Sequence, residues 1–226
     1  MNELLGAGMI LFCFSALLLV YRFFGKTGLF VWIPISVIVA NIQVQKTVEL
    51  FGITCTLGNI LYASSFTVTD ILSENYGKKE ARKAVLIGFF SLIFSTVLFQ
   101  ATLLFTPASS DWAQEYMNGL FSLMPRLIAA SMAAFAVSQT HDVWSYHFWK
   151  RILPEKKWIF VRNNMSSLVS QALDTLVFVT VAFYGLYEGS ILFEIFLTTY
   201  TVKAFVTLCD TPLVYAAVRL QRFEKP

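Results

Sequence analysis

Residues 84–105 read AVLIGFFSLIFSTVLFQATLLF, a run of 22 residues without a charged side chain. About 20 apolar residues cross the hydrocarbon core of a bilayer as a helix. In lipid, only helices and closed barrels satisfy their own backbone hydrogen bonds. Similar uncharged runs cover residues 4–21, 27–45 and 50–69. The sequence therefore predicts an all-α, polytopic membrane helical bundle that forms a single transmembrane domain over residues 1–226.

The composition agrees with a membrane protein and excludes several other classes. The chain is 57% hydrophobic and 14% charged, whereas a soluble domain carries about 25% charged residues. Its net charge of +3 gives no reason to expect a nucleic acid partner. The three cysteines lie in apolar sequence without a CxxC pair, so we predict neither a disulfide framework nor a metal site. No cofactor is expected. The start, Met1-Asn2-Glu3, has no basic segment, so the first apolar run reads as a span.

Basic residues give the orientation, because cytoplasmic loops are enriched in Lys and Arg. Loops 22–26, 74–83 and 150–163 and the tail from Arg219 hold 14 of the 17 Lys and Arg residues. This pattern predicts an outer N-terminus, a cytoplasmic C-terminus and an outer loop at 107–126 that contains a short interfacial helix. The seven predicted spans cover residues 4–21, 27–45, 53–72, 84–106, 127–149, 164–187 and 190–218.

The orientation can be tested with single cysteines introduced into the predicted cytoplasmic loops. Lys79→Cys and Lys156→Cys should resist an impermeant thiol reagent added to intact cells, because both positions would face the cytoplasm. They should react after the cells are permeabilised. Rapid labelling of either position from outside would contradict the predicted topology.

Aspartates interrupt the apolar segments, although a carboxylate costs about 2.5–3.5 kcal/mol at the centre of an inserted helix. Asp70 and Asp142 lie where predicted spans meet basic cytoplasmic loops, and Glu74 follows Asp70 by one turn. These three residues are predicted either to pair with the loop bases or to form a cytoplasmic gate that opens during transport.

Asp174 lies in the middle of a predicted span, on a polar stripe with Ser167, Gln171 and Thr175. Such a stripe lines protein or water and not lipid. Lys203 is the only cation deep in a span and needs an anionic partner. Asp174, Glu194 and Asp210 are the candidates. A stabilising ion pair and a ligand contact are compatible roles for Asp174.

A second group of polar residues lies at the C-terminal end of the second predicted span. Asn41 and Gln43 are placed deeper than an ordinary outer loop, and their carboxamides offer both donors and acceptors. Asn59 and Tyr62 could face the same space. The alternative is that this patch is simply an outer loop.

Three functional classes fit these features. No HExxH, GxSxG or phosphate-binding glycine loop occurs in the sequence, so we expect no enzyme. The chain could be a transporter, a membrane-embedded enzyme that uses paired aspartates, or a structural subunit of a membrane complex.

Polar motifs at membrane depth carry a resemblance that covers the chain from about residue 39 onward. They are ANIQ at 40–43, TDILSENYGK at 69–78, DVWSYHFWK at 142–150, RNNMSSLVSQALDT at 162–175, and Lys203 followed by TPLVY at 211–215. With these motifs the chain resembles the queuosine precursor transporter family, also called the vitamin uptake transporter family.

The resemblance implies a bacterial inner-membrane importer of 7-deazaguanine bases, in cyano or aminomethyl form, for salvage into tRNA queuosine. It implies a six-helix core similar to the substrate-binding subunits of energy-coupling vitamin transporters, so one of the seven predicted spans would be extra. Asn163, Gln171 and Asp174 match the family's motif. The expected partners are a purine-like small molecule and the lipid bilayer, while a homo-oligomer or an energising module remains open.

Overall fold

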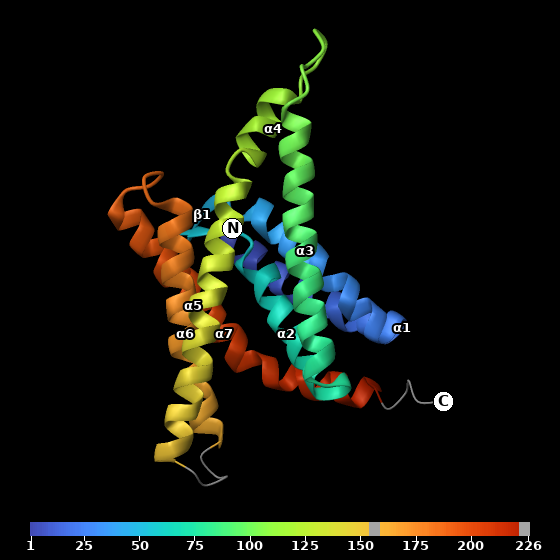
Figure 1. Ribbon diagram of the computed structural model, residues 1–226, viewed down its shortest axis with the longest axis vertical. Coiled ribbons are helices and arrows are strands. Elements are labelled where there is room, and N and C mark those ends of the chain that lie inside the picture. Colours follow the sequence, from blue (N-terminus) through green and yellow to red (C-terminus); the bar gives the residue numbers. More distant parts are fainter. Residues whose placement is uncertain (154–158, 222–226) are drawn as a thin grey trace. The chain divides into compact units, whose positions relative to one another are not determined.

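The computed structural model describes the backbone of residues 1–153 and 159–221 (Figure 1). It describes the side chains of residues 1–153 and 168–205, apart from Phe66, Asp70, Ser73, Glu74, Lys78, Gln139, Thr140, Asp142, Val143, Tyr146, His147 and Lys150. The chain forms two compact units, which are described separately. Unit 1 contains residues 1–125 and 205–226, and unit 2 contains residues 126–204.

Helices make up nearly all of the described chain, in agreement with the predicted class (Figure 1). Among the residues whose side chains are described, three stretches are long and apolar enough to cross a membrane, namely Asn2–Gln43, Lys79–Leu103 and Gln114–Ser138, and Leu168–Phe183 is a shorter apolar helix. The elements are α1 (Asn2–Gln43), β1 (Thr47–Leu50), β2 (Ile53–Thr56), α2 (Asn59–Tyr76), α3 (Lys78–Leu103), α4 (Gln114–Phe121), α5 (Met124–Ile152), α6 (Ile159–Phe183) and α7 (Gly189–Gln221).

The first two predicted spans are the two halves of α1. Gly25 lies between them with φ 54° and ψ −138°, a conformation that only glycine adopts readily. In a straight helix, residues 20 and 28 would be about 12 Å apart. Here a Cβ on Gly28 would come within 2.7 Å of the Val20 carbonyl oxygen. The halves therefore fold back on each other at Gly25, and the predicted loop at 22–26 is a sharp kink.

The third predicted span begins differently from the prediction. Residues 53–56 form β2, which pairs antiparallel with β1, and the helix begins only at Asn59. The connecting residues Phe51 and Gly52 both have positive φ, 53° and 76°, as a two-residue hairpin turn requires. The prediction of a helix over 53–58 is wrong, because residues 53–56 alternate apolar and polar side chains and form a strand with residues 47–50.

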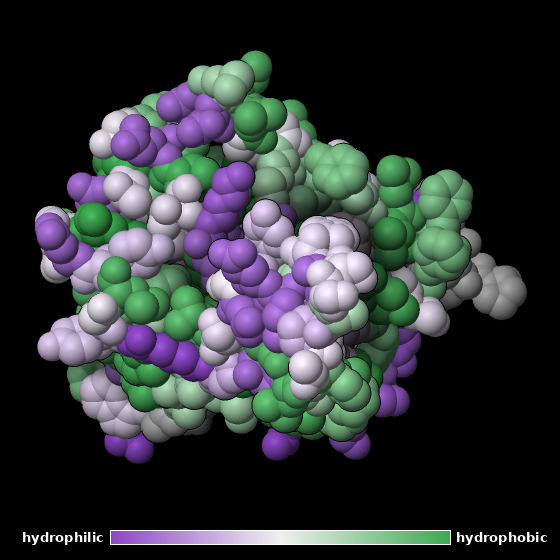
Figure 2. Space-filling model, turned by 90° about the horizontal axis from the view of Figure 1, so that it is seen from above, coloured by the Kyte–Doolittle hydropathy of each residue, from purple (hydrophilic) through white to green (hydrophobic). Residues whose placement is uncertain are grey.

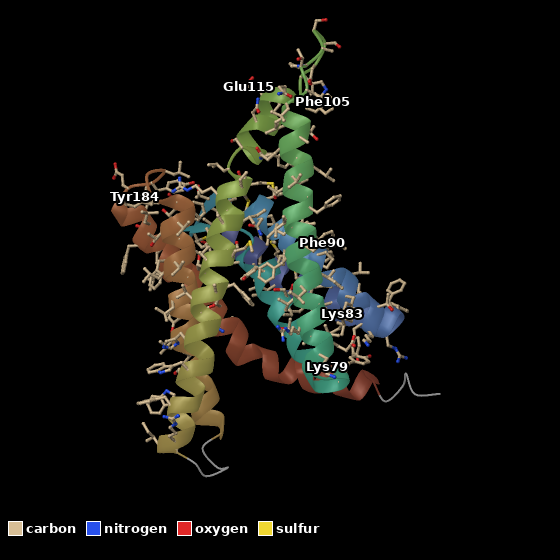
Figure 3. All side chains as sticks on the ribbon, viewed as in Figure 1. Lys79, Lys83, Phe90, Phe105, Glu115 and Tyr184 are labelled. Atoms are coloured by element: carbon tan, nitrogen blue, oxygen red, sulfur yellow. The ribbon has the colours of Figure 1, made fainter. Side chains whose placement is uncertain are left out.

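Helices α1, α2 and α3 pack together in unit 1. A single cluster of buried apolar residues from these helices forms their core: Leu17, Tyr21, Leu29, Ile33, Val68, Ile71, Leu72, Ala81 and Ala84. The predicted loop 74–83 contains only one non-helical residue, Gly77, between α2 and α3. The charged residues at 79–83 of this predicted loop belong to the first turns of α3, where Lys79 and Lys83 lie (Figure 3). There the Glu80 carboxylate pairs with the Lys26 ammonium at 2.7 Å.

Many large apolar side chains of the described residues are exposed, and Figure 2 shows hydrophobic side chains interspersed with hydrophilic ones on the face that it draws. On α3, Leu86, Phe90, Phe94 and Val97 are all more than half exposed, and they follow helical spacing along one face. Soluble monomers rarely expose such continuous apolar surface. This face of α3 is therefore suited to contact the hydrocarbon core of a bilayer. The predicted short helix in the outer loop also forms, as α4.

Candidate functional site

Asp174 and Lys203 form an ion pair within unit 2. The Lys203 ammonium donates from α7 to Asp174 Oδ2 on α6, at 2.6 Å. The two side chains are only 5% and 13% exposed, for Lys203 and Asp174 respectively. The sequence left three carboxylates as candidate partners for Lys203, and the structure pairs it with Asp174, while the Asp210 side chain lies outside the described residues. The predicted pairing is therefore confirmed.

A third helix contributes to the same carboxylate. Ser138 on α5 is buried, and its single hydroxyl hydrogen is shared between two acceptors, Asp174 Oδ1 at 3.3 Å and the Phe135 carbonyl at 3.2 Å. Asp174 thus receives a short charged contact at one oxygen and a longer neutral contact at the other. The second oxygen has the weaker partner, so it is the one that a new donor could engage more readily.

The contact between α5 and α6 continues one turn away from Asp174. His141 Nδ1 lies 3.0 Å from Ser170 Oγ, so that Ser138 and His141 on α5 face Asp174 and Ser170 on α6. Sequence reasoning singled out neither Ser138 nor His141 for this site. Their spacing held a signal, because residues three or four apart share a helix face.

The other residues of the predicted polar stripe on α6 differ from Asp174 in their contacts. Thr175 is fully buried and donates its hydroxyl to the Gln171 carbonyl at 2.8 Å, which is a contact within the helix. Gln171 is half-buried, one turn before Thr175. Asn163 and Ser167 lie outside the described residues. The contacts between helices at this site therefore centre on Asp174.

An open hollow of about 670 Å³ lies in unit 2 and is lined by Ala136, Val137, His141, Trp144 and Leu173. Its lining is mainly apolar, with the imidazole of His141 as its polar group. Trp144 is tilted against His141, with ring centroids 5.8 Å apart. These residues give the α5–α6 pair an aromatic surface beside the polar contact between His141 and Ser170.

The second predicted patch lies in unit 1. Asn41 is buried and donates its amide to the Val37 carbonyl at 2.8 Å. The start of α2 lies against the end of α1, since a Cβ on Gly58 would be 2.6 Å from the Ala40 carbonyl oxygen. Asn59 donates to the Thr56 carbonyl at 3.1 Å. The structure thus brings Asn41, Gln43 and Asn59 to one end of unit 1, and Tyr62 follows one turn along α2.

Two oxygen atoms of this patch lack hydrogen-bond partners within the described part of the chain. They are Asn41 Oδ1 and Gln43 Oε1, and both atoms are buried. The sequence offered this patch either as the wall of a cavity that contacts the substrate or as a simple outer loop. The structure describes the patch and Asp174 in separate units, and the substrate contacts stay a prediction. Asp70, Glu74 and Asp142, the predicted gating or pairing residues, lie outside the described side chains.

Comparisons with known proteins agree on one family. The family model described as "Putative vitamin uptake transporter" matches residues 56–217. A protein of Bacillus subtilis (strain 168) named "Probable queuosine precursor transporter" is 47% identical over 207 residues, covering 92% of this chain and 90% of that protein. No solved structure matches the chain significantly. The resemblance noted in the sequence is confirmed, and the chain belongs to the vitamin uptake transporter family.

Proposed function

We propose that this protein imports a queuosine precursor, a 7-deazaguanine base in cyano or aminomethyl form, across the bacterial inner membrane. The observation that carries the proposal is its 47% identity, over 92% of the chain, to a protein named as a transporter of such a precursor. The apolar helices and the buried polar contacts support a membrane transporter. In this proposal the C-terminus is cytoplasmic, and the helices form a core of six spans with one additional span.

The chemistry of Asp174 fits a guanine-like edge. Such an edge presents a ring N–H and an exocyclic amine side by side, and a carboxylate can accept both hydrogens in charge-assisted hydrogen bonds. A carboxylate has about four lone-pair positions, so Asp174 can keep Lys203 while it accepts from a base. Gln171 and Asn163 would contact the remaining polar edge. Asn41, Gln43, Asn59 and Tyr62 remain predicted contacts of the same substrate.

This arrangement predicts selectivity for guanine-like over adenine-like edges. Adenine presents an unprotonated ring nitrogen where guanine presents an N–H, so a lone pair would face the carboxylate. An unpaired buried polar group costs about 1–3 kcal/mol, which is roughly a 5- to 150-fold difference in affinity. Competition binding to the purified protein measures this difference, and equal affinity for adenine and a deazaguanine would contradict the model.

The function itself is tested in a bacterial strain that cannot synthesise the deazaguanine base and lacks its own importer. With this chain and a low external base concentration, the strain should regain queuosine in its tRNA. A frame-shifted copy of the gene is the control for expression. If the protein is present in the membrane and no modified tRNA appears, the transport proposal is wrong. A membrane enzyme or a complex subunit, the alternatives left open by the sequence, would then be favoured.

A further inference from the structure

We infer that the end of unit 1 formed by α1, β2 and α3 contains a binding site for a monovalent cation, and we assign it to sodium. Four buried side-chain oxygens there have no hydrogen-bond partner among the described residues: Asn41 Oδ1, Gln43 Oε1, Thr56 Oγ1 and Thr96 Oγ1. Asn41, Thr56 and Thr96 are at least 94% buried. Buried polar atoms are nearly always paired, so these atoms point to a missing ligand.

The positions of Asn41, Gln43 and Thr56 follow from close contacts between the end of α1 and the segment that joins β2 to α2. Gly58 has φ +91° and lies so close to α1 that a Cβ would be 2.6 Å from the Ala40 carbonyl oxygen and 3.2 Å from the Val44 amide nitrogen. The Leu57 amide donates to the Lys46 carbonyl at 2.9 Å. Thr56 immediately precedes this contact, so its hydroxyl lies near the last turn of α1, which carries Asn41 and Gln43.

Thr96 on α3 lies at the same level of unit 1. Glu80 of α3 pairs with Lys26 of α1, and further along a Cβ on Gly88 would lie 2.7 Å from the Ile33 side chain. The two helices therefore run in the same direction, with offsets of 54 and 55 between the contacting residues. Thr96 and Asn41 each lie eight residues beyond the contact between Gly88 and Ile33, an advance of about 12 Å on each helix.

The atoms favour a cation of low charge. All four are neutral oxygens, and the Asn41 amide nitrogen is already committed to the Val37 carbonyl. Asn41 and Gln43 lie at the C-terminal end of α1, where the helix dipole is negative. Such helix ends coordinate sodium in secondary transporters. Hard divalent cations prefer carboxylates, and the described residues contain no group of three acidic, His or Cys side chains. Lys46 and Glu49 are exposed.

This inference does not depend on the proposed substrate. It gives Asn41 and Gln43 a different role from direct contact with the base. At the predicted outer end of the second span, the site would be loaded with sodium from outside the cell.

The test uses the purified full-length protein without any base. Its thermal unfolding midpoint is measured while sodium chloride replaces choline chloride at constant total salt, with potassium chloride as a comparison. The midpoint should rise saturably with sodium, and potassium should require at least about tenfold higher concentration for the same rise. Equilibrium binding of radioactive sodium should show one saturable site that choline does not displace. Identical midpoints in sodium, potassium and choline would overturn the inference.

Variants with matched shape locate the site. Thr56→Val and Thr96→Val remove one oxygen each and should raise the half-saturating sodium concentration by about tenfold or more. Since both hydroxyls are unpartnered in the described chain, the midpoint without sodium should stay equal or rise, which separates the effect from misfolding. Thr102→Val on the same helix is the control, because its hydroxyl donates to the Leu98 carbonyl at 2.9 Å. Wild-type sodium dependence in both site variants would also overturn the inference.

The outcome is independent of the base. A specific sodium shift without any binding of a deazaguanine base would support this site and count against the proposed substrate. Base binding without any sodium-dependent shift of the unfolding midpoint would support the proposed substrate and count against the sodium site.

Discussion

Asp174→Asn should bind a deazaguanine base about 10- to 150-fold more weakly than the wild type, because a hydrogen bond to a charged group is worth about 1.5–3 kcal/mol. Asparagine keeps the shape of the side chain but replaces one acceptor oxygen by a donor. Binding of labelled base to the purified protein measures the change. Asp111→Asn is the matched control, since Asp111 is an exposed aspartate whose carboxylate accepts from the Ala113 amide.

The same substitution should lower stability, because Lys203 would remain buried without its anion. Removing one partner of a buried ion pair typically costs about 3–5 kcal/mol, and the amide oxygen of asparagine should reduce that loss. The double variant Asp174→Asn with Lys203→Gln removes both charges. Its thermal midpoint should recover toward the wild type, because no buried charge is then left unpaired.

Base binding in the double variant separates the two roles of Asp174. If the carboxylate contacts the base, the double variant regains stability but still binds weakly. If the carboxylate serves only to neutralise Lys203, the double variant regains both. Recovery of both properties, or wild-type binding by the folded single variant, would contradict the substrate assignment.

Gly58→Ala should destabilise the protein by more than about 3 kcal/mol or prevent its accumulation in the membrane. Its φ of +91° is strained for any residue with a side chain, at a cost of about 1–3 kcal/mol. In addition, the new methyl group would be 2.6 Å from the Ala40 carbonyl oxygen, so α1 and the start of α2 would have to separate. Thermal unfolding of the detergent-purified protein measures the loss.

Gly77→Ala isolates the cost of that close approach. Gly77 has nearly the same φ, +89°, but a Cβ there would meet nothing within 4 Å. It should therefore show only the backbone strain. If the two alanine variants are equally stable, the tight packing of α2 on the end of α1 is not a source of stability.

Helical segments were predictable wherever apolar residues run long enough to cross a bilayer. Residues 4–21 and 27–45 became the two halves of α1, and 84–106 corresponds to α3 apart from its ends. The strand at 53–56 was not predictable in the same way, because Ile53 and Cys55 read as part of an apolar run of about helical length. Its hairpin depends on the positive φ of Phe51 and Gly52 and on pairing with residues 47–50.

The candidate site was predictable in part for a related reason. An aspartate and a lysine within apolar segments each need an opposite charge, so a pairing of Lys203 with one of three carboxylates followed from their presence alone. Ser138 is ordinary in sequence, and serines are common within membrane helices. It joined the site only through α5 packing against α6, with its partner Asp174 36 residues away.

By itself, then, the sequence determined that the chain is a helical membrane protein with buried charges, because the length of apolar runs and the cost of a bare charge in lipid depend only on local composition. The tertiary structure decided which carboxylate faces Lys203, how sharply α1 turns at Gly25, and which polar oxygens of unit 1 are buried without a hydrogen-bond partner among the described residues. Those features depend on the contacts between helices distant in sequence, and the hydrophobic pattern of each helix is compatible with many such contacts.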